Sequence, residues 1–286
     1  MDQISNAREF QSVCDALRGK GKTVGLVPTM GALHDGHKHL IILAREQCDV
    51  VAVSIFVNAL QFDNPVDLEK YPRTLASDLE LAKSLGVDLV FTPNSQEMHP
   101  EPILFHLEVN RLSDVLEGAS RPGHFGGVVT VVSKLFVIAG RCRAYFGEKD
   151  FQQLAIVSRM VEEMHFPVEV VPVPIVRDPR GLALSSRNMR LTTDQLVSAL
   201  ALSRSLFAGR DAIQGGERDP GMVEEVMARE LNRERKGIAK TDLAVLDYAL
   251  VVDPRTLEKP ERIEGPVRLL IAARVGDVRL IDNVGA

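Results

Sequence analysis

Short runs of apolar, often β-branched residues alternate with helical patterns along the first 177 residues of the chain. The runs cover 23–28, 49–57, 87–92, 143–146 and 168–176. Between them, apolar residues recur at helical spacing over 38–47, 75–85, 128–138 and 151–164. Near-continuous apolar strands that alternate with helices are typical of a parallel sheet covered on both faces. The pattern therefore predicts an α/β fold with a doubly wound parallel sheet, in which ligands bind beyond the carboxyl ends of the strands.

The pattern changes after residue 177. Two long helices are predicted over 193–208 and 220–235, separated by a loop over 213–218, and Asp219 and Pro220 are suited to start the second helix. Strands are predicted over 247–252, 268–275 and 278–283, with Gly276-Asp277 as a two-residue hairpin turn. Helices followed by an antiparallel sheet indicate a separate domain. We therefore expect a Rossmann-like domain over 1–177 and a smaller α+β lid domain over 178–286.

Composition and charge narrow the classes of partner. The chain has 286 residues, 45% hydrophobic and 26% charged, which excludes a disordered or fibrous protein. Its net charge of −5 argues against broad binding to nucleic acid or to an anionic membrane, because both require clustered positive charge. Cys14, Cys48 and Cys142 form no CxxC pair, so no disulfide framework or cysteine zinc site is expected. With no apolar run of ~18 residues and no charged-then-apolar leader, we expect a cytoplasmic protein.

A histidine and glycine motif follows the first apolar run. Residues 28–37 read Pro-Thr-Met-Gly-Ala-Leu-His-Asp-Gly-His. His34 and His37 share one face at the start of the next helix, where free amides and the helix dipole attract phosphate. Gly31 and Gly36 allow the backbone to pass close to a ligand. The alternatives are a tight turn with two surface histidines, or a zinc site, for which further ligands at suitable spacing are missing.

Two polar blocks follow later strands. Gln61, within Phe-Val-Asn-Ala-Leu-Gln-Phe, offers a donor and an acceptor to a small substrate with hydroxyls and a carboxylate, although a capped strand end explains it as well. Residues 147–153 read Gly-Glu-Lys-Asp-Phe-Gln-Gln. Lys149 is a compact cation suited to ATP phosphates, and Asp150 lies at a helix start where it caps amides or accepts from a ribose hydroxyl. A generic charged loop is the alternative for this block.

The last block lies where the pattern changes. Residues 176–188 include Ser185, Ser186 and Arg187, two hydroxyls beside a guanidinium that form a cationic clamp for a triphosphate. A flexible interdomain linker is the other interpretation. The clamp and the linker interpretations are compatible, because mobile loops often close over substrates.

These four blocks, in this order between residues 28 and 188, resemble the pantothenate synthetase family. The first is the HxGH element of the nucleotidylyltransferase superfamily, and the others are similar to the family's FVNPxQF, GxKDxQQ and LAxSSRN sequences. The chain departs from the family pattern at Ala59, usually proline, and at Asp178-Pro179-Arg180, often an acidic-Ala-Asp run. The resemblance implies a ligase in which the pantoate carboxylate attacks the α-phosphorus of ATP, giving pantoyl adenylate and pyrophosphate. The amine of β-alanine then attacks the acyl carbon, giving pantothenate and AMP.

The resemblance also implies residue roles. Catalytic roles fall to His34, His37, Lys149 and Arg187, and pantoate and β-alanine contacts to Gln61 and Gln153. The expected ATP-binding residues are Met30, Gly31, Ala32, Leu33, His34, Asp35, Gly36, His37, Gly147, Glu148, Lys149, Asp150, Val176, Leu184, Ser185, Ser186 and Arg187. Mg²⁺ is expected with ATP and no dedicated protein metal site, while Asp78 is a further candidate for contacting magnesium or β-alanine. A homodimer is also implied.

Two other functions stay open on the sequence alone. One is a different enzyme of the superfamily that adenylylates a nucleotide or another acid, against which the blocks around Gln61 and Gln153 argue. The other is a nucleotide-binding relative without turnover, against which the intact His34, His37, Lys149 and Arg187 argue.

Overall fold

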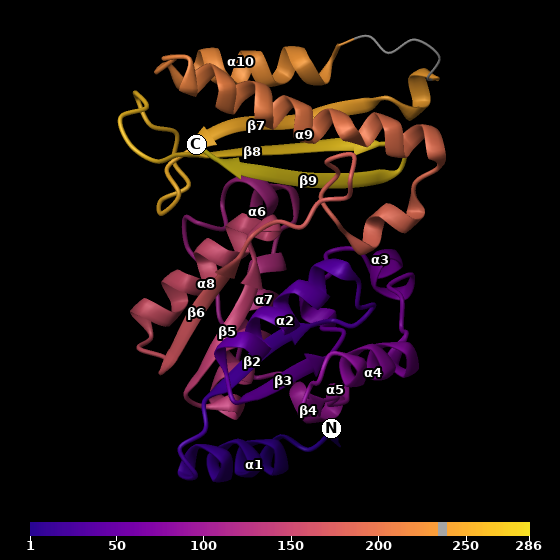
Figure 1. The fold of residues 1–286 in the computed structure, drawn as a ribbon, viewed down its shortest axis with the longest axis vertical. Coiled ribbons are helices and arrows are strands. Elements are labelled where there is room, and N and C mark those ends of the chain that lie inside the picture. Colours follow the sequence, from indigo (N-terminus) through magenta and orange to yellow (C-terminus); the bar gives the residue numbers. More distant parts are fainter. Residues whose placement is uncertain (234–238) are drawn as a thin grey trace. The chain divides into compact units, whose positions relative to one another are not determined.

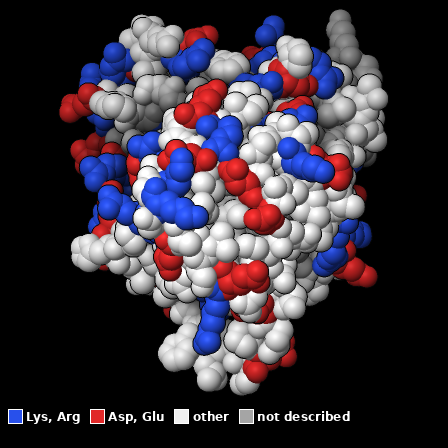
Figure 2. All heavy atoms as spheres, turned by 60° about the horizontal axis from the view of Figure 1, so that its bottom comes forward, with Lys and Arg blue, Asp and Glu red and all other residues white. Residues whose placement is uncertain are grey.

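The computed structural model describes residues 1–233 and 239–286, and the chain divides into two compact units. Unit 1 comprises 1–148 and 152–174, and unit 2 comprises 149–151 and 175–286. Within the described residues, no helix has both the length and the apolar character needed to cross a membrane. On the face that Figure 2 shows, basic and acidic side chains lie intermixed.

A six-stranded parallel sheet forms the centre of unit 1 (Figure 1). Its strands are β1 (Asp2–Ile4), β2 (Val24–Thr29), β3 (Val50–Ile55), β4 (Leu89–Phe91), β5 (Cys142–Gly147) and β6 (Val168–Val173), in the order β1-β4-β3-β2-β5-β6. From β2 the chain proceeds outward through β3 to β4 and then returns to β5 on the other side of β2. The strand order therefore reverses between β2 and β5, which is where doubly wound sheets bind their ligands.

Helices cover both faces of this sheet. They are α1 (Ala7–Gly19), α2 (Asp35–Gln47), α3 (Pro65–Glu69), α4 (Leu75–Ser84), α5 (Ser95–Met98), α6 (Leu116–Ser120), α7 (His124–Ala139) and α8 (Phe151–Glu163). Ile41 of α2 and Ala82 of α4 pack in one apolar cluster with Val90 and the other β side chains of that face. On the opposite face, α1 and α7 pack through the ring pairs Phe10–Phe91 at 4.8 Å and Phe136–Phe146 at 6.3 Å. Side chains alternate between faces along a strand, so both faces are buried.

Unit 2 contains a three-stranded antiparallel sheet with two long helices on it (Figure 1). The elements are η3 (Ser186–Arg190), α9 (Thr193–Gln214), α10 (Pro220–Leu231), η4 (Lys240–Asp242), β7 (Ala244–Val252), β8 (Arg268–Val275) and β9 (Val278–Gly285). The predicted start of α10 is confirmed, because the Asp219 carboxylate accepts from the amides of Gly221 and Met222. The hairpin is also confirmed: β8 and β9 join at Gly276-Asp277, with Gly276 at φ +55.

The α/β fold class predicted from the sequence is confirmed, and the differences lie at element ends. The sequence reading did not include β1 or α1. The helix predicted over 193–208 continues to Gln214. It therefore includes the first two residues of the loop predicted over 213–218, and the rest of that loop lies outside the helix. The strand predicted over 168–176 ends at Val173. The last two residues of the helix predicted over 220–235 lie outside the described residues, and the described helix ends at Leu231.

Candidate active site

The HxGH motif forms the turn from β2 into α2, and its two histidines hold the start of that helix. His34 is the N-cap, and its Nδ1 accepts from the amide of Gly36 over 3.1 Å. The Nδ1 of His37 accepts from the amide of His34 over 3.3 Å, and the two rings lie 4.1 Å apart. A ring nitrogen that accepts a hydrogen bond carries no proton, so each neutral imidazole carries its N–H at Nε2. The pairing therefore fixes both tautomers.

Two glycines of the motif are required by close contacts. A Cβ at Gly36 would lie 2.8 Å from Cε1 of His34, so only glycine lets the ring fold back onto the helix start. Gly31 has φ +82, and a Cβ there would lie 3.0 Å from the Asp78 carboxylate and 3.1 Å from Ile55. Glycine is thus needed at position 36 by the His34 ring and at position 31 by the positive φ and the neighbouring Asp78 and Ile55 side chains.

Asp78, at the start of α4, anchors this turn. It is buried, its Oδ2 accepts from the amide of Ala32 over 3.0 Å, and its Oδ1 accepts from that of Leu33 over 2.8 Å. Gly31 and Ala32 both have positive φ, which directs successive amides to one side, as in backbone anion sites. The amides of Ala32 and Leu33, which precede α2, are therefore engaged by this carboxylate. Likewise, the Asp78 carboxylate faces this turn rather than an open position for magnesium.

Changing Asp78 to asparagine is expected to loosen the turn. One carboxylate oxygen becomes an NH₂ group facing a backbone N–H, which costs about 1–3 kcal/mol for the unsatisfied donor. We expect Asp78→Asn to lower the unfolding temperature and kcat/KM together. Thermal unfolding and steady-state kinetics measure both, with Glu80→Gln on the exposed side of α4 as control. An Asp78→Asn protein with the parent's unfolding temperature and kinetics would show that the carboxylate does not hold the turn.

The backbone at Gln61 is held by the start of α7. Gln61 lies in η1 (Ala59–Gln61), a 3-10 turn after β3. Its carbonyl accepts from Nδ1 of His124 over 2.7 Å and from the guanidinium of Arg121 over 3.2 Å. A Cβ at Gly127 would lie 2.3 Å from the carbonyl oxygen of Leu60, so the turn packs directly on the helix backbone. Arg121 and His124 therefore position the backbone of Gln61.

The two predicted substrate-binding glutamines differ in their surroundings. The Gln61 side chain is 9% exposed, its Oε1 accepts from Asn58 over 3.0 Å, and its Nε2 lies 3.1 Å from Sδ of Met30. The structure thus brings Gln61 together with the HxGH turn in unit 1. Gln153 is half-buried in α8, and its side-chain amide has no hydrogen-bond partner within the described part of the chain. Its neighbour Gln152 instead bonds the backbone of residues 112, 115 and 117.

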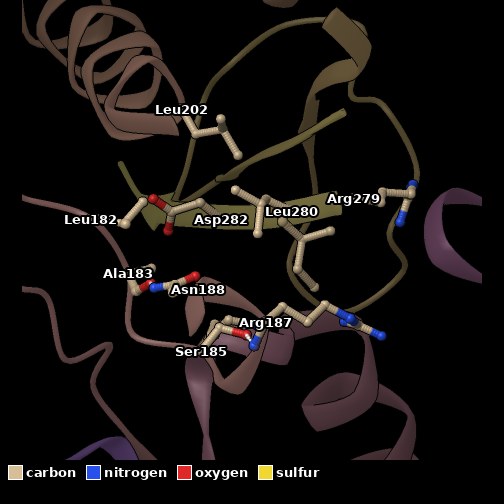
Figure 3. A pocket seen from close by; sticks show the side chains of 11 residues that line it. Leu182, Ala183, Ser185, Arg187, Asn188, Leu202, Arg279, Leu280 and Asp282 are labelled. Carbon is tan, nitrogen blue, oxygen red and sulfur yellow. Dashed lines mark hydrogen bonds between the residues drawn. The ribbon is translucent and has the colours of Figure 1, made fainter. Parts of the chain in front are cut away.

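A pocket within unit 2 brings the lysine block together with the serine and arginine block. Lys149 lines it together with residues of β9 and α9. Ser185, Arg187 and Asn188 also line it, as Figure 3 shows. Lys149 is 17% exposed, and its Nζ lies 3.2 Å from Oδ1 of Asp150. Ser185 caps η3 by accepting from the amide of Arg187 over 3.3 Å. Lys149 and Arg187 are 38 residues apart in sequence (187 minus 149), so the fold brings these cations together with the Ser185 hydroxyl.

The segment before Ser185 is tied to β9. Arg177 and Ala183 form an antiparallel bridge, and the amide of Leu184 donates to the carbonyl of Val176 over 2.9 Å. The guanidinium of Arg177 makes two bonds to Asp282, of 2.5 and 2.9 Å. Burial raises the pKa of Asp282, and the Arg177 charge opposes that shift. The predicted ATP contacts Val176 and Leu184 therefore lie in a small hairpin with a fixed base.

The other predicted residues fall at strand and helix ends. Gly147 ends β5, Glu148 and Asp150 lie in η2 (Glu148–Asp150), and Ser186 begins η3. Among the described residues, no group of three or more His, Cys, Asp or Glu side chains is arranged to hold a metal ion.

A family model described as pantoate-beta-alanine ligase matches residues 2–285. The chain belongs to the pantoate–β-alanine ligase family. The pantothenate synthetases of Moorella thermoacetica and Heliobacterium modesticaldum are each 46% identical over 284 residues, covering 99% of this chain and 98% and 99% of theirs. The family assignment from the four sequence blocks is confirmed, and with it that the chain is an enzyme of the ligase class.

Solved structures of this family share the fold. The pantothenate synthetase of Thermus thermophilus is 40% identical, with a TM-score of 0.89 and 99% coverage of both chains. A pantoate-beta-alanine ligase from Francisella tularensis, crystallised with beta-gamma ATP and β-alanine, is 34% identical, with a TM-score of 0.77 and coverage of 99% and 97%.

Sequence reasoning missed several residues that shape the site. Asn58 stands inside a quoted block, yet nothing local indicates that its amide bonds Gln61. His124 was also missed, because its contact with the Gln61 carbonyl spans 63 residues. The Arg177–Asp282 pair spans 105 residues. The sequence did offer one signal for the last pair. Asp282 and Asn283 stand within an otherwise apolar strand, and such polar residues need hydrogen-bond partners when they are buried.

Proposed function

We propose that this enzyme condenses pantoate with β-alanine, using ATP, through a pantoyl adenylate, and releases AMP and pyrophosphate. The observation that carries the proposal is the pocket of unit 2, where Lys149, Ser185 and Arg187 gather groups suited to phosphate oxygens. The Francisella relative, crystallised with beta-gamma ATP and β-alanine, supports the same pair of ligands here.

The residues proposed to contact ATP fall into two groups. In unit 1, His34 and His37 hold their ring N–H groups at Nε2, which suits them to donate to a phosphoryl oxygen. In unit 2, Lys149 and Arg187 stabilise negative charge that develops on the phosphates. Residues 1–177 then form the ATP- and pantoate-binding domain and 178–286 the lid domain. The predicted ATP contacts at 30–37, 147–150, Val176 and 184–187 remain part of this proposal.

Activation by ATP agrees with the state of the cysteines. Cys14, Cys48 and Cys142 are all buried, and burial raises the pKa of Cys14 to about 11 and of Cys142 to about 12. A thiol with a raised pKa is a poor nucleophile at neutral pH, so these two are unsuited to form an acyl-enzyme. Conversion of the carboxylate into a mixed anhydride with AMP supplies the leaving group instead. Catalysis then depends on positioning and on charge stabilisation.

Magnesium is proposed to arrive with ATP. Asp78 uses both oxygens on backbone amides, and Asp150 lies beside the Lys149 ammonium. Both carboxylates are therefore engaged within the chain, and phosphate oxygens and water are the natural ligands of the ion. When bound, Mg²⁺ neutralises phosphate charge.

We also propose a cytoplasmic homodimer. Leu104 and Phe105 are 77% and 84% exposed, and large apolar side chains at such exposure are typical of contact surfaces. Phe105→Asp is expected to shift the protein toward monomer in sedimentation equilibrium. A parent protein that sediments as a monomer at micromolar concentration would contradict the dimer.

A substrate-omission assay tests the function. Enzyme, ATP, pantoate and β-alanine are incubated together and with each small molecule left out, and nucleotides, phosphates and pantothenate are quantified. We expect pantothenate, AMP and pyrophosphate in equal amounts only in the complete mixture. ADP and phosphate as products would exclude adenylation. Turnover with another acid or a nucleotide but not pantoate would indicate a different superfamily enzyme, and ATP binding without turnover a non-catalytic relative.

A further inference from the structure

A continuous hydrogen-bonded chain of four polar side chains leads through unit 1 to Gln61. Lys134 comes from α7, His99 from the end of α5, and Asn58 from the segment after β3. Asn58 and His99 are 1% and 7% exposed. Nothing in the family resemblance assigned a role to His99 or Lys134, which lie 38 and 73 residues from Gln61 (99 minus 61, 134 minus 61).

The hydrogen atoms of this chain have one consistent arrangement. The amide nitrogen of Asn58 donates to the carbonyl of Gly127 over 3.0 Å, and a carbonyl only accepts. The same nitrogen lies 3.0 Å from Gln61, which must therefore present its oxygen there. Gln61 is left with its NH₂ group directed elsewhere, 3.1 Å from the Met30 sulfur, a weak acceptor that a substrate oxygen can replace.

The other end of the chain is fixed by a charge. The oxygen of Asn58 lies 2.9 Å from Nε2 of His99, so that nitrogen must carry a proton. Nδ1 of His99 lies 3.4 Å from Nζ of Lys134, which also donates to the carbonyl of Met98. An ammonium only donates, so Nδ1 accepts and the imidazole is neutral. Burial, and then the Lys134 charge, lower the pKa of His99, which agrees with this state.

We propose that His99 and Lys134 are positioning residues that orient the Gln61 amide so that it donates its N–H groups to the hydroxyl and carboxylate oxygens of the acid substrate. Lys134 selects the Nε2–H tautomer of His99, His99 sets the Asn58 amide, and Asn58 sets Gln61. The inference rests on the proposed function only in naming pantoate as the acid. With the opposite orientation, Gln61 would present its oxygen to the substrate carboxylate, which only accepts hydrogen bonds and would be repelled.

The tautomer is measured directly in the ligand-free enzyme. Two-bond ¹H–¹⁵N correlation spectra of the imidazoles distinguish Nε2–H, Nδ1–H and protonated rings, and His99→Gln identifies the signal. We expect a neutral Nε2–H ring for His99 in the parent and a loss of that state in Lys134→Met. An Nδ1–H or protonated ring in the parent would overturn the inference.

Kinetics of matched variants test the consequence. His99→Phe removes the donor to Asn58, and we expect the pantoate KM to rise about tenfold, equivalent to one hydrogen bond of ~1.4 kcal/mol. His99→Gln, whose NH₂ group lies near the position of Nε2, is expected to restore most of it. Lys134→Met raises the pantoate KM, whereas Lys83→Met, an exposed lysine on α4, leaves it unchanged. The KM for ATP stays within about twofold in all four variants, because the hydrogen bond that is lost binds the acid substrate and not ATP.

The outcomes separate this inference from the proposed function. A parent enzyme that forms no pantothenate would contradict the proposed function, while the tautomer measurement would still decide the hydrogen-bond arrangement. Equal pantoate KM values in His99→Phe and parent would overturn the positioning role. So would a parallel rise of the pantoate and ATP KM values with a lower unfolding temperature, which indicates general loss of structure.

Discussion

Replacing Lys149 with alanine is expected to lower kcat by about 10²–10³, the usual loss when a preorganised electrostatic contact is removed. The Lys149 side chain is only 17% exposed and lines the pocket that Ser185 and Arg187 also line. It is held before substrate binds, because Nζ lies 3.2 Å from Oδ1 of Asp150 and the Lys149 carbonyl accepts from Asn283 over 2.9 Å. A cation fixed in this way acts on charge that develops in the transition state. The KM for pantoate should therefore change much less than kcat.

Steady-state kinetics with all three substrates measure this effect. Lys20→Ala, which removes an exposed lysine at the end of α1, is the matched control and should retain the parent rate. Lys149→Arg keeps the charge but not its compact shape, so an intermediate rate is expected. If Lys149→Ala turned over within a few-fold of the parent, Lys149 would be a surface charge and not part of catalysis.

Changing Gln61 is expected to affect the acid substrate and not ATP. Gln61→Leu removes the NH₂ group and leaves substrate oxygens unpaired, which costs about 1–3 kcal/mol per group, or roughly a tenfold to hundredfold rise in the pantoate KM. Leucine also leaves the Asn58 amide without its acceptor at 3.0 Å. Part of the loss will therefore be seen in the unfolding temperature.

Gln61→Glu separates the two effects. A glutamate oxygen still accepts from Asn58, but the remaining oxygen replaces the donor and places a negative charge near the pantoate carboxylate. We expect near-parent stability with a pantoate KM at least as high as that of Gln61→Leu. Gln214→Leu, an exposed glutamine at the end of α9, is the control. Impaired ATP binding with an unchanged pantoate KM in Gln61→Leu would show that Gln61 does not bind the acid.

The sequence predicted the parallel sheet because the central strands of that sheet are long and apolar. β2 and β3 are each six residues with nearly continuous burial, so their pattern is unambiguous. β1 has three residues and buries one of them, which leaves no periodic signal. α1 did carry a signal that was overlooked: Asn6 caps it, and Phe10 and Cys14, one turn apart, are its buried residues. Short edge strands depend on tertiary pairing, which a local pattern does not encode.

The site residues were predictable where chemistry is concentrated in a motif and not where contacts are distant. The HxGH turn, Gln61, Lys149 and the 185–187 block were all named from sequence. The residues that hold these groups in place were not predicted, because their contacts are distant in sequence. Asp78 bonds Ala32 across 46 residues, and Arg177 bonds Asp282 across 105.

In the proposed reaction, an acyl adenylate forms before β-alanine takes part. Enzyme at a known site concentration is mixed rapidly with MgATP and pantoate, without β-alanine, and pyrophosphate is followed in time. We predict a burst of about one pyrophosphate per site followed by a slow phase, as burst kinetics separate chemistry from product release. The isolated enzyme should then convert its retained intermediate into pantothenate and AMP when β-alanine alone is added. Pyrophosphate release that strictly requires β-alanine would contradict the two-step mechanism.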